Sequence, residues 1–151
     1  MSYTKAIYHI IFRTKSGIPA ITEKYEKILY TFIWKFIKER KSVLYCVNGM
    51  PDHIHLLVDL HPTISVSAFV QQLKNATHLL VERHKEEFPL FTAWSVGYCA
   101  LTYSERDKMQ IINYIKNQKE HHKTQDFLDE VKVLMIESGI EINEKFFERD
   151  L

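Results

Sequence analysis

At 151 residues, with 46% hydrophobic and 26% charged residues, the chain has the composition of a soluble globular protein and the length of one domain, residues 1–151. It contains no run of eighteen apolar residues and no apolar leader segment, so we expect no membrane contact and a cytoplasmic location. The formal charge is only +1, but residues 1–50 carry nine Lys and Arg against three Asp and Glu. A basic face of this kind is compatible with nucleic-acid binding, although plain solvated surface gives the same pattern.

The periodicity of the apolar residues predicts eight elements. In chain order they are a central strand at 3–14, a helix at 22–41, a strand at 42–48, a strand at 52–59, a helix at about 65–84, a strand at 94–103, a helix at 104–122 and a helix at about 125–138. The order β-α-β-β-α-β-α-α predicts an α+β protein with a ferredoxin-like antiparallel sheet and two helices on one face. Cys46 and Cys99 each lie in a strand-like run, where we expect buried, unpaired thiols.

The strand at 52–59 alternates between two kinds of side chain. His53 and His55 share one face, while Ile54, Leu56 and Val58 form an apolar face that should pack on the core. Two imidazoles two residues apart on a strand lie side by side, so both can bind one metal ion. Taken alone, the spacing is explained equally well by two half-exposed histidines with no ligand.

A second pattern lies in the helix predicted at 104–122. Ser104 with Asp107 three residues later is typical of a helix start, and Tyr114 and Gln118 then lie one above the other on the same helical face. With His53-Ile54-His55 and the pair Tyr114 and Gln118, the sequence resembles the single-tyrosine HUH transposases, which include the repetitive-element-associated tyrosine transposases. HUH stands for His-hydrophobe-His. The resemblance covers nearly the whole chain, from Tyr8-His9-Ile10-Ile11-Phe12 through Trp94-Ser95-Val96-Gly97-Tyr98 to Gly139-Ile140-Glu141.

The resemblance implies a metal-dependent endonuclease and DNA transposase with a C-terminal helix that carries the nucleophilic tyrosine. Tyr114 would cut single-stranded DNA at hairpin-bearing element ends, leaving a 5′-phosphotyrosine and a free 3′-hydroxyl. His53, His55 and Gln118 would bind Mg²⁺ or Mn²⁺. The resemblance also implies a homodimer.

Four further residues are candidates for DNA contact. Arg13 and Lys15 follow the first strand within the basic third of the chain, and His121 and His122 are expected at a solvated helix end. His9 lies on a strand next to the metal face, where it either approaches the metal or is a buried structural histidine.

Two other functions fit parts of the pattern. One is a non-catalytic or domesticated nucleic-acid-binding module of the same fold, and the other is a histidine-rich metal-binding protein unrelated to DNA. Neither needs Tyr114 and Gln118, so their presence favours the transposase.

Overall fold

The computed structural model describes residues 2–145 and 147–151. Its strands are β1 (Ile7–Arg13), β2 (Val43–Met50), β3 (His53–Asp59) and β4 (Cys99–Tyr103). Its helices are α1 (Glu26–Glu39), α2 (Val66–Arg83), α3 (Lys108–Lys116), α4 (Gln118–His121), α5 (Phe127–Glu137) and α6 (Phe147–Asp150), with short 3-10 turns at Lys15–Gly17 and Glu105–Asp107. Within the described ranges, no helix combines the length and the apolar character that a membrane crossing requires.

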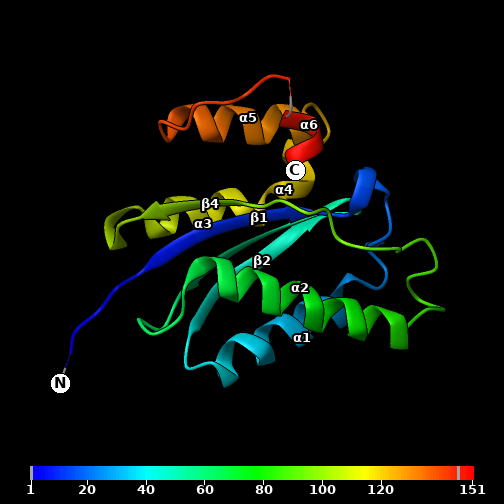
Figure 1. Cartoon of the computed structure of the whole chain (residues 1–151), viewed down its shortest axis with the longest axis horizontal. Helices are drawn as coiled ribbons and strands as arrows, with labels where there is room; N and C mark the ends of the chain where they lie inside the picture. Colours follow the sequence, from blue (N-terminus) through cyan, green and yellow to red (C-terminus); the bar gives the residue numbers. More distant parts are fainter. Residues whose placement is uncertain (1, 146) are drawn as a thin grey trace.

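The four strands form one antiparallel sheet in the order β2-β3-β1-β4. Helices α1 and α2 cover one face, and α3, α4 and α5 lie over the other (Figure 1). This arrangement confirms the predicted α+β class with a ferredoxin-like sheet. Strand β1 is central as predicted, since it lies between β3 and β4, and apolar side chains on both of its faces are buried.

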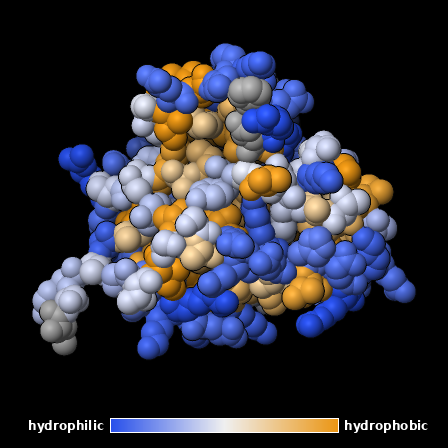
Figure 2. All heavy atoms as spheres, in the orientation of Figure 1, coloured by the Kyte–Doolittle hydropathy of each residue, from blue (hydrophilic) through white to orange (hydrophobic). Residues whose placement is uncertain are grey.

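The main core lies between the sheet and the pair α1 and α2. It receives Ile54, Leu56 and Val58 from β3, as the alternation predicted. Two smaller apolar clusters lie on the opposite face. Under α3, Ile7 and Leu57 pack against Ile111, Ile112 and Ile115, and the cluster under α5 consists of Ile11, Cys99, Leu101, Phe127, Val131 and Leu151. Apolar side chains also reach the outer surface of α5, where Val133 and Ile136 are exposed (top of Figure 2).

The hairpin of β2 and β3 places the histidine strand. Met50 pairs with His53, so the turn consists of only Pro51 and Asp52. A Cβ atom on Gly49 would lie 2.2 Å from the carbonyl oxygen of His53, far inside van der Waals contact. Only glycine therefore allows the two strands to approach this closely at the start of the histidine motif.

The fourth strand is shorter than the predicted 94–103. Trp94 makes only an isolated bridge with Thr14, and regular pairing begins at Cys99. Between these points the register changes, and Lys74 donates hydrogen bonds to the carbonyls of Ser95 (2.8 Å) and Gly97 (2.7 Å).

The predicted helix at 104–122 is also wrong in its continuity. It consists of a 3-10 turn, α3 and α4, with a break at Asn117. Asn48 on β2 donates its side-chain amide to the carbonyls of Ile115 (3.0 Å) and Lys116 (3.2 Å), and thus satisfies the end of α3 from outside the helix. Tyr114 and Gln118 therefore lie on two helices that meet at this junction.

Two other helix ends have local features that fit their positions. The hydroxyl of Ser65 accepts from the amide of Ala68 at 3.2 Å and caps α2, and Gly139 has φ of 78° just after α5. Both cysteines are free thiols; Cys99 is buried and Cys46 is half-buried.

Candidate metal and tyrosine site

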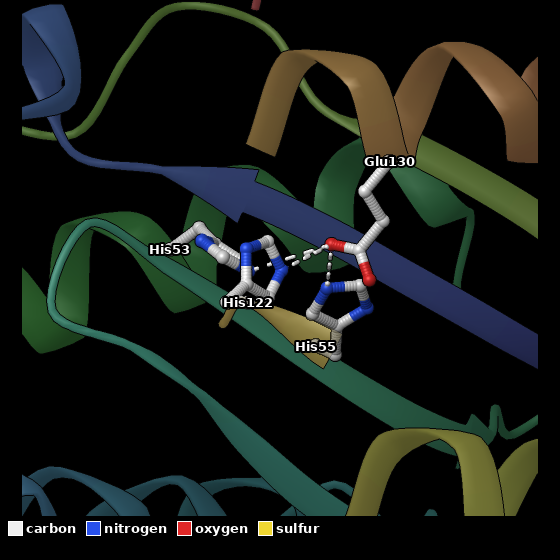
Figure 3. Close-up of side chains that lie close together, drawn as sticks. All are labelled: His53, His55, His122 and Glu130. Carbon is white, nitrogen blue, oxygen red and sulfur yellow. Dashed lines mark hydrogen bonds and ion pairs between the residues drawn. The ribbon is translucent and has the colours of Figure 1, made fainter. Parts of the chain in front are cut away.

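The two histidines of β3 lie on the sheet face that α3, α4 and α5 cover. His53 and His55 both have zero exposure, so the alternative of half-exposed histidines is wrong. The chain after α4 and the helix α5 bring two further residues over them, His122 and Glu130 (Figure 3). The site is therefore enclosed by segments from both halves of the chain.

One carboxylate oxygen of Glu130 lies among three imidazoles. Its Oε1 is 2.8 Å from Nε2 of His122, 3.1 Å from Nε2 of His55 and 3.6 Å from Nε2 of His53. In Figure 3 the Glu130 side chain descends from α5 toward these rings. Since Glu130 is only 1% exposed, its charge is compensated by these groups and not by water.

The other oxygen of Glu130 binds the helical pair that the sequence singled out. The hydroxyl of Tyr114 donates a hydrogen bond to Oε2, and the side-chain amide of Gln118 donates to the same atom at 2.8 Å. The structure thus brings Tyr114 and Gln118 together with both histidines, despite the break between α3 and α4.

His53 has a partner on each ring nitrogen. Its Nδ1 lies 2.7 Å from Oδ1 of Asp52, and its Nε2 lies 3.2 Å from Oε1 of Gln118. The Asp52 carboxylate is a hydrogen-bond acceptor, so it places the hydrogen of a neutral His53 on Nδ1. The Nε2 lone pair of His53 then faces the carbonyl oxygen of Gln118. A cation placed between these two atoms would accept both lone pairs.

The charges in the cluster follow from burial and hydrogen bonding. Burial alone would raise the pKa of Glu130, but hydrogen bonds from His122, His55 and Tyr114 hold that pKa well below its usual range. Burial works to lower the pKa of His122, but the hydrogen bond to Glu130 and its charge outweigh burial and raise it. Burial lowers the pKa of His55 to about 4. Burial and then the Glu130 carboxylate raise the pKa of Tyr114, so its phenol is protonated in this state.

The donor set fits a divalent cation. His53, His55, His122 and Glu130 each offer one ligand atom, and these four atoms lie within 4.8 Å of one another. Atoms that ligate one small cation at about 2.1 Å are about 3 Å apart, which is close to the separations of 2.8–3.6 Å around Glu130 Oε1. Imidazole nitrogens and carboxylate oxygens together suit Mn²⁺ better than Mg²⁺.

The candidate DNA contacts have different environments. Lys15 is exposed, whereas the guanidinium of half-buried Arg13 donates to the carbonyl oxygens of Leu151 and Glu148. His121 is half-buried, with its ring centroid 4.6 Å from that of Tyr114. The expectation of a solvated end is wrong for His122, whose side chain is 6% exposed because it packs against Glu130.

Glu130 is the site residue that sequence reasoning missed. A signal was present, since Glu130 shares the spacing of the buried residues Phe127 and Val131 on α5. A carboxylate on the apolar face of an amphipathic helix needs a partner inside the protein. The pattern did not reveal the partner, because residues 53 and 130 are far apart in the sequence.

Comparison with known proteins places the chain among transposases. The model of the family described as "Transposase IS200 like" matches residues 2–118. The ISDra2 transposase TnpA of Deinococcus radiodurans is 36% identical over 115 residues, which are 74% of this chain and 82% of the relative. A transposase of insertion sequence element IS200 from Salmonella typhimurium is 27% identical over 120 residues, 77% of this chain and 78% of the relative.

Two solved structures are similar. A crystal structure of a transposase from Deinococcus radiodurans R1 has a TM-score of 0.56 and 28% identity, covering 78% of this chain and 95% of that one. A REP-associated tyrosine transposase bound to a REP hairpin has a TM-score of 0.58, covering 81% of this chain and 72% of that one; at 15% identity it shows the fold alone.

The fold is thus that of transposases of known structure. The chain belongs to the IS200-like transposase family, which confirms the resemblance read from the sequence. His53, His55, Tyr114 and Gln118 lie within the residues that the family model matches, whereas Glu130 lies after them.

Proposed function

We propose that this transposase cuts and rejoins single-stranded DNA at hairpin-bearing element ends, with Tyr114 as the nucleophile. His53, His55 and Gln118 would hold Mg²⁺ or Mn²⁺, and Glu130 is available as a fourth ligand. The observation that carries the proposal is the convergence of Tyr114 and Gln118 on the carboxylate that also contacts both histidines.

Hydrogen bonds within the protein orient the proposed metal ligands. Asp52 orients His53 through Nδ1, and Gln118 is held over Nε2 of the same ring. When bound, the cation would withdraw electron density from the scissile phosphate and make its phosphorus more electrophilic. Enclosure of the site strengthens these electrostatic interactions, since water does not screen them.

The proposed covalent step conserves the number of phosphodiester bonds. The Tyr114 oxygen forms a bond to phosphorus while the bond from phosphorus to the 3′-oxygen breaks. Overall, the phenol loses a proton and the 3′-oxygen gains one. The products are a 5′-phosphotyrosine and a 3′-hydroxyl, so attack by another 3′-hydroxyl can rejoin a strand without an external energy source.

The charged groups around Arg13 support a path for the DNA backbone. Among the described residues that line a groove of about 680 Å³ are four basic ones, Arg13, Lys15, Lys145 and Arg149, and the acidic Glu148. We propose that phosphates follow this groove, with Lys15 as an exposed contact and Arg13 at the groove wall. His121, beside Tyr114, and His122 are proposed to approach DNA only near the cut. The similar REP-associated transposase is bound to a REP hairpin, in agreement with a hairpin substrate.

Assembly as a homodimer is part of the same proposal and rests on the family resemblance. Sedimentation velocity at micromolar concentration tests it directly, and a monomer with or without DNA would contradict it.

The activity test uses hairpin-bearing single-stranded DNA with Mn²⁺, analysed on a denaturing gel. We expect strand cleavage and a covalent adduct from the wild type, and neither from the His53→Ala or His55→Ala variants. Tyr98→Phe is the matched control for a Tyr114→Phe variant, because Tyr98 packs against the main core on the opposite sheet face. Binding of the hairpin without cleavage or adduct by the wild type would instead support a non-catalytic DNA-binding module.

A further inference from the structure

His9, on the neighbouring central strand β1, contacts the candidate metal site through His55. In the register of β1 and β3, Ile11 pairs with His55 and His9 pairs with Leu57, so His9 is diagonal to His55 on the same sheet face. Nε2 of His9 is 2.8 Å from Nδ1 of His55, and both side chains have zero exposure. This distance is that of a buried hydrogen bond between two imidazoles.

Such a bond fixes the position of a hydrogen atom on each ring. Two ring nitrogens at this distance share one hydrogen, so one ring donates and the other accepts. Both rings have zero exposure, and burial favours the neutral form of an imidazole, so each ring carries a single hydrogen. The hydrogen on His55 is either at Nδ1, facing His9, or at Nε2, facing Glu130.

We propose that His9 is a positioning residue that selects the metal-binding tautomer of His55. This inference rests on the proposed function, because it assigns the cation to Nε2 of His55. With the cation bound, that nitrogen must present a lone pair, so the hydrogen of His55 lies on Nδ1 and is donated to Nε2 of His9. Among the described residues within hydrogen-bond distance, His9 is the acceptor for this hydrogen.

The other nitrogen of His9 supports a two-state arrangement. Its Nδ1 is buried and, within the described part of the chain, has no hydrogen-bond partner. Without a cation, His9 Nε2–H donates to His55 Nδ1, and His55 Nε2–H donates to Glu130. With a cation bound, the hydrogen of each ring would lie on Nδ1, so the two rings together would neither gain nor lose a proton. His9 Nδ1 is the atom that takes the relocated hydrogen.

The first test measures Mn²⁺ binding without DNA, by electron paramagnetic resonance of the free ion. In His9→Phe the ring remains but the acceptor is lost, and we expect a dissociation constant about 10–100 times higher. His9→Gln is the matched control, since its side-chain oxygen lies near the position of Nε2 and can accept from His55. It should bind Mn²⁺ nearly as tightly as the wild type. Wild-type affinity in His9→Phe would overturn the inference.

A second measurement uses only the wild type, and so does not depend on the folding of a variant. Long-range proton–nitrogen NMR of the histidine rings distinguishes Nδ1–H from Nε2–H. Saturation with Mg²⁺ should move His55 from Nε2–H to Nδ1–H and His9 in the same sense. If His55 changes while His9 keeps its hydrogen on Nε2, the proposed role of His9 is wrong.

A third variant separates this inference from the proposed function. If His53→Ala binds Mn²⁺ as tightly as the wild type, the cation is elsewhere and the proposed site fails as a whole. If His53→Ala loses binding while His9→Phe keeps it, the cation site stands and only the role of His9 is overturned.

Discussion

The hydroxyl of Tyr114 donates a hydrogen bond to Oε2 of Glu130, a carboxylate from a helix sixteen residues further along the chain. The same carboxylate accepts from Gln118 and contacts the imidazoles of His53 and His55. Without DNA, the proposed nucleophile is therefore engaged and protonated. A phosphate that approaches Tyr114 must first replace this contact.

Replacing Tyr114 with Phe tests the nucleophile. The variant should form no covalent adduct and should not cut DNA, while its affinity for Mn²⁺ stays near that of the wild type. Loss of a hydrogen bond to a charged acceptor should lower the free energy of unfolding by about 1.5–3 kcal/mol. Mass spectrometry of the wild-type adduct should locate the nucleotide on Tyr114. An adduct on Tyr103 or Tyr98 would contradict the mechanism.

Asn48 is expected to hold the junction between α3 and α4. In Asn48→Ala the carbonyls of Ile115 and Lys116 lose their donor, and Lys119 loses one of its acceptors. We expect a loss of about 1–3 kcal/mol in urea unfolding and weaker Mn²⁺ binding, because Gln118 directly follows the junction. Asn75→Ala, at an exposed position on α2, is the control. Equal stability and metal affinity in both variants would refute this role.

Gly49 and Gly139 should respond differently to substitution by alanine. Gly49→Ala brings a methyl group against the backbone of β3, so we expect a loss of about 3 kcal/mol or more and a displaced His53. Gly139→Ala meets no atom within 4 Å and suffers only from its positive φ, so the cost should be about 1 kcal/mol. Chemical denaturation compares the two, and a smaller effect at Gly49 would show that the hairpin adjusts.

Acid should destabilise the metal-free protein before its carboxylates titrate. The folded-state pKa of His55 is about 4, against about 6.5 unfolded. The unfolded chain therefore binds a proton that the folded chain does not, and stability falls as the pH drops from 6.5 to 4 by about 1.4 kcal/mol per unit.

His9 acts in the same direction as His55. His122 opposes them only above about pH 6.5, because its folded-state pKa is raised and its contribution is complete below the unfolded value. Melting curves in EDTA between pH 7 and pH 4 measure the sum. His9→Gln should flatten the slope, since it removes one of the titrating groups. A melting temperature that is constant over this range would show that the imidazoles do not contribute as inferred.

Local patterns were sufficient for the parts of the site that lie within single elements. The alternation in β3 predicted which residues face the main core, and the helical spacing paired Tyr114 with Gln118. The break at Asn117 was not predictable locally, because the donor to the last carbonyls of α3 is Asn48 on a distant strand. The contact of Glu130 with His53 likewise depends on how α5 packs over the sheet.

The way α5 is attached has a consequence for local opening. Its cluster, with Phe127 and Val131 at its centre, is separate from the main core under α1 and α2. Detachment of α5 would expose that cluster and leave the sheet paired, so its amide hydrogens should exchange through a partial opening that costs less than global unfolding. The same opening would free Tyr114 from Glu130. Native-state hydrogen exchange of the α5 amides, compared with the amides of β1 and β3, should therefore show a lower opening free energy for α5 than for the sheet.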